Sequence, residues 1–415
     1  MSLRGAPDFL ELRRARLVVA GAAVTGLLLR LFLLLTTPGT ADVRIFHGFA
    51  KAVGEFGPVR IYAQPLPGLP LYNHPPLTGW MLLGMDKLEG LGIPFSVLIR
   101  LPATLADAVA AVLVFEIIRR RARVRTATAC ACVVALSPLL IAISGHHGNN
   151  DPVAVMFALA AAHLLADRKR PLAAGIAAAV AVSIKFVPVV TIPVLLVVAA
   201  RAGRPVFVRF CAGLTGLMAL VWGPSVLTVP EALKEHVIDY SGGRWHLWGL
   251  VRFADWLDMP GAIAFARGSG HLLLVLLCVA VGVWLAWWRP AEAPVVVGLT
   301  LALLLLLSTG SAIQYLAWPA AGLCAVGLWE GAAYNAVLGV VAYLVYTGRF
   351  ATRWSEAALL VAAFGWLVLA AGIASGIHKL LIRPRPTAAN HLQALKKVGA
   401  PRSERASEIA EYSAK

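Results

Sequence analysis

Apolar runs long enough to cross a lipid bilayer recur along almost the whole chain, and they limit the possible folds more than any other feature. Of the 415 residues 59% are hydrophobic and 14% are charged, whereas a soluble domain is about 45–50% apolar and about 25% charged. The runs lack the two-residue alternation of a transmembrane β-barrel. We therefore predict an all-α polytopic membrane protein with about twelve transmembrane helices (roughly 10–13).

The expected spans each need roughly 17–25 residues, and the three between 151 and 201 are short enough to be tilted or incomplete. The predicted spans are 17–37, 95–118, 126–145, 151–166, 171–186, 187–201, 206–227, 270–288, 294–310, 314–330, 333–348 and 355–377.

The net charge of +16 is explained by topology rather than by binding of nucleic acid. If both termini are cytoplasmic, most Lys and Arg residues fall on the cytoplasmic side, including those in 119–125 and 168–170. This is the distribution that the positive-inside rule predicts, and it also favours contact with anionic lipids. The five cysteines lie in apolar segments and indicate no disulfide framework.

The chain divides into a membrane domain, residues 1–383, and a polar, basic tail, residues 384–415, which we expect to be cytoplasmic and disordered. The first apolar run follows several arginines and has no cleavage site, so we expect it to remain as an anchor. Two structured loops, 38–94 and 228–269, are predicted on the outer face. The second contains Trp245, Trp248 and Trp256, which are typical of amphipathic helices at the membrane interface.

The loop at 38–94 follows the first span directly, and a long structured loop in that position indicates a functional role. Asp42 lies about one turn beyond the span and is our candidate catalytic carboxylate. The alternatives are that Asp42 is a solvated acid at the membrane interface, or that it merely caps the N-terminus of a helix over 43–53, because Asp is a good N-cap residue.

Two further segments place polar groups at the predicted outer ends of helices. The stretch 137–152 (S-P-L-L-I-A-I-S-G-H-H-G-N-N-D-P) crowds polar side chains into one short turn, but such a turn rarely supplies a full set of metal ligands. Lys185 stands between two apolar runs, either as a lysine that reaches the interface or as a positive charge for a phosphate group.

Charged residues also occur inside two predicted spans. Arg30 and Asp107 both lie in the outer halves of their helices, and because unpaired charges are costly there we expect them to pair. In the segment 308–323, Ser311, Gln314 and Tyr315 could donate hydrogen bonds to a sugar or a phosphate.

Four motifs together resemble the GT-C superfamily, whose polytopic glycosyltransferases use polyprenyl- or dolichyl-phosphate sugars. The layout is most similar to the GPI mannosyltransferase I type and its bacterial relatives, over roughly residues 17–330. The motifs are D-V-R-I-F followed by Y-N-H-P-P-L-T-G-W-M-L-L, then S-P-L-L-I-A-I-S-G-H-H-G-N-N-D, V-S-I-K-F-V-P-V-V and S-A-I-Q-Y-L-A-W-P.

The sequence departs from that family at one position. Many relatives have a D-x-D pair in the first loop, but the first position is Thr40 here, which leaves Asp42 alone. This departure favours a mechanism with a single base and no cofactor, and a divalent metal is not favoured.

The resemblance implies a hexosyltransferase that moves a sugar from a polyprenyl-phosphate donor to a hydroxyl group of a glycan, lipid or glycolipid acceptor, with inversion and with Asp42 as general base. Mannose is favoured, and glucose, galactose and arabinose remain open. The implied sites fall into two groups. Donor phosphate or lipid would contact Lys185, Arg244, His147, Gln314 and Tyr315. Sugar or acceptor would contact Tyr72, Asn73, His74, Asn149, Asp151 and Trp248.

Two other classes of function remain open. A transporter or lipid flippase would use Arg30, Asp107 and Lys185 along a translocation path, although no internal repeat supports it. A scaffold subunit of an envelope-polymer assembly would need neither Asp42 nor Lys185. The composition favours a bacterial inner membrane, with the active site on its outer face.

Overall fold

The computed structural model describes residues 9–240, 249–348 and 356–382, and all regular elements in these residues are helices. The chain divides into two compact units, 1–377 and 378–415, and the architecture below is that of the first. The predicted tail, 384–415, lies outside the described residues, as do Trp245, Trp248 and Arg244. The main helices of the first half are α1 (Phe9–Thr36), α2 (Ala41–Phe56), α3 (Pro76–Gly90), α4 (Phe95–Leu98), α5 (Leu101–Ile118), α6 (Val124–Ala135), α7 (Pro138–Ala142), α8 (Asp151–Ala166), α9 (Pro171–Ile184) and α10 (Ile192–Arg201).

The second half is built in the same way. Its helices are α11 (Arg204–Thr228), α12 (Pro230–Leu233), α13 (Leu250–Trp256), α14 (Pro260–Arg267), α15 (Ser269–Trp288), α16 (Ala293–Leu307), α17 (Ala317–Val326), α18 (Leu328–Tyr346) and α19 (Glu356–Ile382). Short 3-10 or π turns complete the set: η1 (Arg60–Ala63), η2 (Ile143–His147), η3 (Val187–Thr191), η4 (Lys234–Ile238), η5 (Pro290–Glu292) and η6 (Ile313–Leu316).

The positions of the twelve predicted spans are all occupied by apolar helical segments. Within the described residues, eight segments are long and apolar enough to cross a membrane, and four others are shorter. The short ones are Asp151–Ala166, Pro171–Ile184, Val187–Arg201 and Ile313–Val326. This confirms the prediction of an all-α polytopic membrane protein and is consistent with a GT-C-like bundle.

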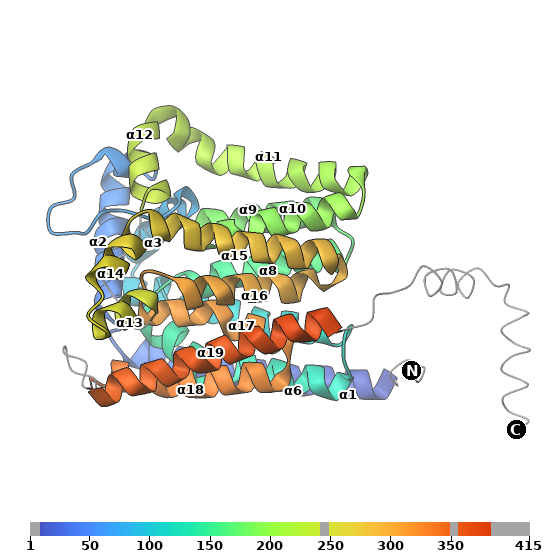
Figure 1. Ribbon diagram of the computed structural model, residues 1–415. Helices are drawn as coiled ribbons and strands as arrows, with labels where there is room; N and C mark the ends of the chain where they lie inside the picture. The colour runs from blue at the N-terminus through green and yellow to red at the C-terminus, as the bar shows by residue number, and fades with distance from the viewer. Residues whose placement is uncertain (1–8, 241–248, 349–355, 383–415) are drawn as a thin grey trace, which may run out of the picture. The chain divides into compact units, whose positions relative to one another are not determined.

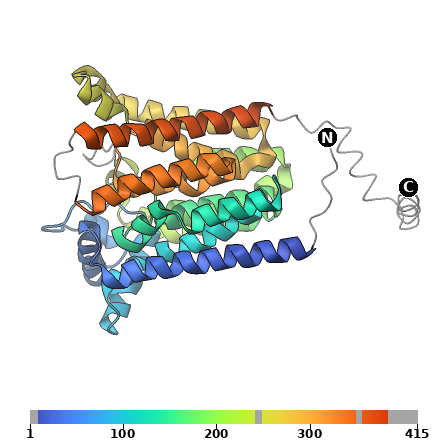
Figure 2. The same cartoon turned by 90° about the horizontal axis from the view of Figure 1, so that it is seen from below.

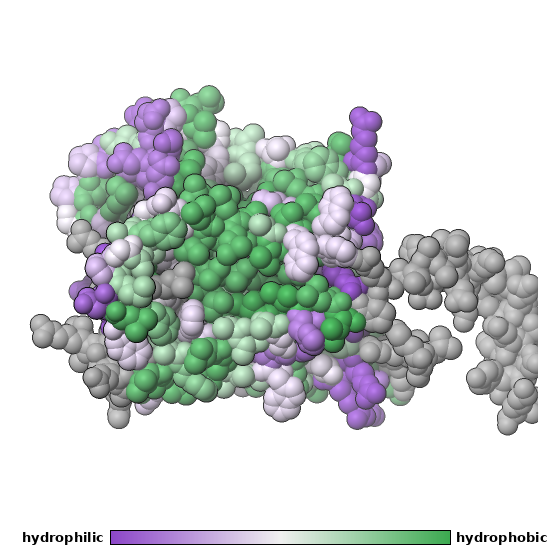
Figure 3. Space-filling model, in the orientation of Figure 1, coloured by the Kyte–Doolittle hydropathy of each residue, from purple (hydrophilic) through white to green (hydrophobic). Residues whose placement is uncertain are grey.

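The long helices run side by side, and the helices outside the spans collect at one end of the molecule (Figures 1 and 2). These are α2 and α3 from the loop 38–94, and α12, α13 and α14 from the loop 228–269. On the face shown in Figure 3, hydrophobic side chains cover the middle and hydrophilic ones gather towards the two ends. This distribution is the one expected of a helical bundle surrounded by lipid.

The short helices α8 and α9 form an antiparallel hairpin in the interior. Helix α9 packs between α8 and α11, and most of its alanines are buried. Small side chains allow helix backbones to approach closely where no hydrophobic driving force is available. The hairpin brings its two open ends, Asp151 and Lys185, together. They lie beside α3, because Thr78 of that helix donates a hydrogen bond to the carbonyl of Ile184, the residue before Lys185.

Candidate functional site

Asp42 lies in the first turn of α2, and it does not cap that helix. The N-cap residue is Thr40, whose hydroxyl accepts a hydrogen bond from the Asp42 backbone N–H at 3.3 Å. The alternative that Asp42 serves only as a cap is therefore wrong. The Asp42 side chain remains 31% exposed, so one part of its carboxylate can meet a substrate.

His147 holds the other side of the Asp42 carboxylate. Its Nε2 lies 3.0 Å from Oδ2 of Asp42, and its Nδ1 lies 2.9 Å from the hydroxyl oxygen of Tyr346. The backbone carbonyl of His147 accepts a hydrogen bond from the Thr40 hydroxyl at 2.8 Å. His147 was expected at the donor phosphate, and Tyr346, which lies on α18 and has no neighbouring motif, was not predicted.

The turn that carries His147 has a geometry that is often found at functional sites. Residues Ile143–His147 form the π turn η2, and such turns insert a residue that redirects the following side chains. Gly148 follows with φ of 87°, and a Cβ at this position would lie 2.5 Å from Cγ2 of Val43. Glycine therefore allows the turn to pass close to α2.

A buried arginine joins the end of α1, which leads into α2, to the turn that carries His147. Arg100 has no exposed surface and donates to the backbone carbonyls of Leu34, Thr37 and Gly145 at 2.9–3.2 Å. It also donates to the Ser96 carbonyl and the Thr37 hydroxyl. Because these acceptors belong to the end of α1 and to η2, one side chain fixes both segments. The sequence analysis did not single out this residue.

Lys185 lies in a second cluster, opposite a carboxylate that is completely buried. Its Nζ is 3.5 Å from Oδ2 of Asp151, and it sits 5.9 Å from the centre of the Tyr315 ring. Trp318 donates its indole N–H to Oδ1 of Asp151 at 2.6 Å and stacks on Tyr315. Asp151 has 0% exposed side chain and Lys185 has 16%, so Lys185 is the accessible member of the pair.

The two clusters interact electrostatically. Burial alone would raise the pKa of the Asp42 carboxyl, but the hydrogen bond from His147, with a smaller contribution from the charge of Lys185, holds that pKa below its usual value. Asp42 is thus ionised at neutral pH. The arrangement offers an ionised carboxylate on α2 and a cation at the end of α9 that are close enough to interact electrostatically.

Tyr72 and His74 lie beneath this site rather than on an open surface. Tyr72 is fully buried, and the His74 ring packs against Phe46 and Phe49. Burial, followed by the charge of Lys185, lowers the pKa of His74 to about 3. His74 is therefore neutral at pH 7, and its contacts make it a support for α2.

Arg30 and Asp107 lie in contact, as expected for two charges inside predicted spans. Nε of Arg30 is 3.0 Å from Oδ2 of Asp107, and both side chains are almost completely buried. Ser144 donates to the same carboxylate oxygen at 2.6 Å, and Arg30 also donates to the carbonyls of Gly26 and Ala135. The pair thereby ties α1 and α5 to the η2 turn.

The remaining predicted residues are placed as follows. Asn149 is buried and accepts from the Asp151 backbone N–H at 3.3 Å, while Asn73 and Gln314 are half-buried. Arg244 and Trp248 lie outside the described residues. No group of three or more His, Cys, Asp or Glu side chains in the described part of the chain is arranged to hold a metal ion.

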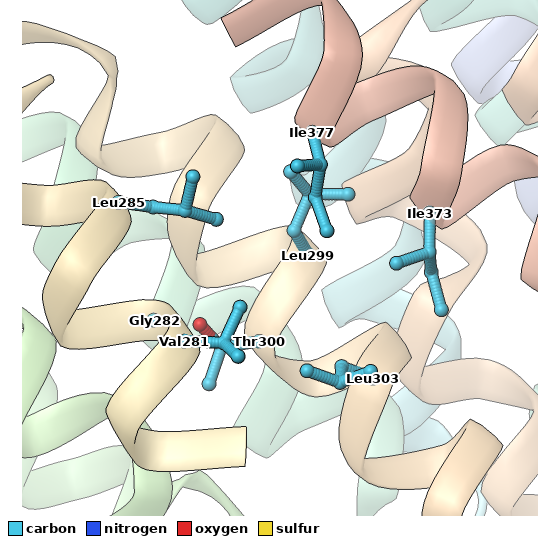
Figure 4. Close-up of a pocket in the computed structure, with 8 residues that line it drawn as sticks. All are labelled: Val281, Gly282, Leu285, Leu299, Thr300, Leu303, Ile373 and Ile377. Atoms are coloured by element: carbon cyan, nitrogen blue, oxygen red, sulfur yellow. The ribbon is translucent and has the colours of Figure 1, made fainter. Parts of the chain in front are cut away.

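A small apolar pocket lies elsewhere, between α15, α16 and α19 (Figure 4). Its lining includes Val281, Leu303 and Ile373, and its one hydroxyl, on Thr300, donates to the Val296 carbonyl. The pocket has no charged lining and no room for a water molecule. It therefore offers nothing comparable to the paired charges near Asp42.

The site thus combines a partly exposed, ionised carboxylate with a partly exposed lysine at one end of a helical bundle. Residues 73–227 match the family model described as dolichyl-phosphate-mannose-protein mannosyltransferase. The match supports the GT-C superfamily and a polyprenyl-phosphate sugar as donor. It covers less than half of the chain: His147 and Lys185 lie within it, and Asp42 and Tyr346 lie outside. No curated protein matches the chain.

Proposed function

We propose that the protein transfers a hexose, with mannose favoured, from a polyprenyl-phosphate sugar to an acceptor hydroxyl group, with inversion at the anomeric carbon. The observation that carries this proposal is that an ionised, partly exposed Asp42 and a partly exposed Lys185 lie at the same end of the bundle. The family match supports the donor class. The GPI mannosyltransferase I likeness remains a proposal within that class.

In the proposed reaction, the acceptor oxygen attacks the anomeric carbon while the bond from that carbon to the phosphate oxygen breaks. The acceptor proton passes to Asp42, which needs no cofactor for this step. The electron pair of the broken bond remains on the phosphate. Inversion requires the acceptor and the leaving phosphate to lie on opposite faces of the sugar.

Lys185 would stabilise the leaving phosphate, because its ammonium group is a positive charge in a poorly solvated place. Asp151 and Trp318 would hold that ammonium group in position. This differs from the contact with sugar or acceptor that the sequence suggested for Asp151, since its carboxylate is completely buried. Tyr315, beside Lys185, would stay close to the donor phosphate.

We place the reaction on the non-cytoplasmic face. The positive-inside rule supports this, because the basic segments 119–125 and 168–170 connect helices at the end of the bundle opposite α2 and α3. A bacterial inner membrane, both termini inside and an acceptor in a cell-envelope glycan are parts of the same proposal.

The test uses the protein in lipid nanodiscs with polyprenyl-phosphate donors that carry different labelled hexoses and a pool of membrane-glycan acceptors. Wild-type protein should release label from one donor, and Asp42→Asn should slow the transfer by about 10²–10⁴-fold, the usual contribution of a general base. Glu55→Gln, an exposed acid on the same helix, is the matched control and should be as active as wild type.

Two outcomes would contradict the proposal. Transfer by Asp42→Asn at the wild-type rate would remove Asp42 as the base. Movement of an intact labelled lipid across the bilayer without loss of sugar, unaffected by Asp42→Asn, would favour the flippase alternative.

A further inference from the structure

Three side chains from distant parts of the chain form one line of hydrogen bonds. Asp42 belongs to α2, His147 to η2 and Tyr346 to the last turn of α18. The two distances along the line are 3.0 Å and 2.9 Å. The Asp42 side chain is 31% exposed and can meet an acceptor, whereas the His147 side chain is only 6% exposed.

The chemistry of these groups limits where the protons can lie. An ionised carboxylate only accepts hydrogen bonds, so Nε2 of His147 must carry the proton that it donates to Asp42. In a neutral imidazole, Nδ1 is then an acceptor, and the hydroxyl group of Tyr346 is the donor that it meets. The hydrogen bonds at the two ring nitrogens therefore favour the same tautomer, and the one to Tyr346 stabilises the proton on the nitrogen that faces Asp42.

We propose that Tyr346 is a positioning residue for Asp42: its hydroxyl group selects the tautomer of His147 that donates to the catalytic carboxylate. This inference rests on the proposed function, in which Asp42 takes the acceptor proton. Tyr346 and His147 keep their own protons throughout the transfer. Their effect is to keep the Asp42 carboxylate ionised and to fix its orientation.

Removal of the Tyr346 hydroxyl should remove one of the two hydrogen bonds that stabilise the Nε2–H tautomer of His147, so that the other tautomer becomes populated. With the proton on Nδ1, Nε2 would turn a lone pair towards the carboxylate, and Asp42 would lose its donor. The other groups that face Asp42 are Lys185 and His74, with Tyr315 further along the same field. None of them donates a hydrogen bond to Asp42 in the described structure, so none replaces His147.

The experiment compares Tyr346→Phe with Tyr343→Phe in nanodiscs. Tyr343 lies one turn earlier on α18 and is 59% exposed, so its variant controls for the loss of a tyrosine hydroxyl from the same helix. Nitrogen NMR of protein labelled with ¹⁵N-histidine reports the tautomer of His147, and His147→Gln assigns the signals. Thermal melting shows whether each variant folds.

We expect wild type and Tyr343→Phe to show the Nε2–H tautomer alone and Tyr346→Phe to show a mixture. In the transfer assay, Tyr346→Phe should lower kcat about tenfold near pH 6, as expected for the loss of one hydrogen bond to a charged network, and should move the acidic limb of the pH profile upwards. The KM for the donor should stay unchanged. The Tyr343→Phe profile should match wild type.

The proposal is overturned if Tyr346→Phe keeps the wild-type tautomer, or if both ring nitrogens are protonated in wild type, because Tyr346 would then be the acceptor. The NMR measurement needs no substrate, so it is valid even if no donor is turned over. If Asp42→Asn loses the transfer activity while Tyr346→Phe is as active as wild type at every pH, this inference alone is refuted. Absence of sugar transfer with any donor would count against the proposed function alone.

Discussion

The ammonium group of Lys185 lies 3.5 Å from Oδ2 of Asp151, and only the lysine of this pair is exposed. Asp151 is oriented from its other side by the indole N–H of Trp318. A buried carboxylate that is held in this way fixes a cation at a boundary where an anionic group can approach it. The pair therefore explains how a lysine next to an apolar helix can remain charged and stationary.

Asp151→Asn should weaken the binding of polyprenyl phosphate, because it removes the counter-ion of Lys185 but keeps an oxygen that can accept from Trp318. We expect a loss of about 1.5–3 kcal/mol, the usual size of a hydrogen bond to a charged group. Calorimetric titration with polyprenyl phosphate measures it. Trp318→Phe is the control, since it keeps the ion pair and should weaken the binding less. Equal affinity of Asp151→Asn and wild type for polyprenyl phosphate would argue against the role of the pair.

Arg30 and Asp107 should behave as one unit in stability measurements. Arg30→Met or Asp107→Leu alone leaves a buried charge without its partner, which costs about 3–5 kcal/mol. The double variant should be milder than the worse single variant, because it leaves no charge behind. Thermal unfolding in detergent compares the stability of the single and double variants. A double variant that is no milder than the worse single one would show that the contact contributes no coupling.

His74 should make the protein sensitive to acid. Burial depresses its pKa to about 3 from the ordinary value of 6.5. At a pH between these two pKa values, the unfolded chain therefore binds a proton that the folded protein does not bind. Stability should fall as the pH drops below 6.5, by roughly 1.4 kcal/mol per pH unit for this one proton.

The variant His74→Phe tests that expectation, because an aromatic ring can stay among Phe46 and Phe49 without a proton to gain. Melting temperatures between pH 7 and pH 4.5 should fall less steeply in this variant than in wild type. Parallel slopes for wild type and His74→Phe would show that His74 does not titrate in this way.

Arg100→Lys should damage both stability and activity although it keeps the positive charge. Lysine has three donors on one nitrogen and cannot reproduce the planar set of hydrogen bonds to Leu34, Thr37 and Gly145. We expect a loss of about 2–4 kcal/mol in unfolding free energy. Arg60→Lys, at an exposed position, is the matched control. Wild-type melting and transfer rates in Arg100→Lys would show that charge alone is sufficient there.

The sequence predicted the helical class and the order of its elements well, because long apolar runs and basic connections depend on local composition. It was less accurate at the boundaries of α1, which begins at Phe9 rather than near residue 17. Arginines in the segment 13–16 suggested an end there, but they lie within a continuous helix whose side chains can reach the interface.

The candidate site was predicted in part. Asp42, His147, Asp151 and Lys185 were all singled out, because acids, histidines and lysines beside apolar runs are visible in the sequence. Tyr346 was missed, since its partner His147 is 199 residues away and no spacing reveals such a contact. The capping alternative for Asp42 failed for a related reason: the choice between Thr40 and Asp42 as cap depends on backbone geometry.

The hairpin of α8 and α9 has a consequence for the depth of the site. The two helices have 16 and 14 residues, so they extend about 24 Å and 21 Å at 1.5 Å per residue. The hydrocarbon layer of a typical bilayer is about 30 Å thick. If the far ends of the hairpin lie at one surface, then Asp151 and Lys185 stop several ångströms short of the other. The phosphate group of a lipid would have to move slightly below the membrane surface to contact Lys185. The thickness of the host membrane should therefore affect how readily this contact forms.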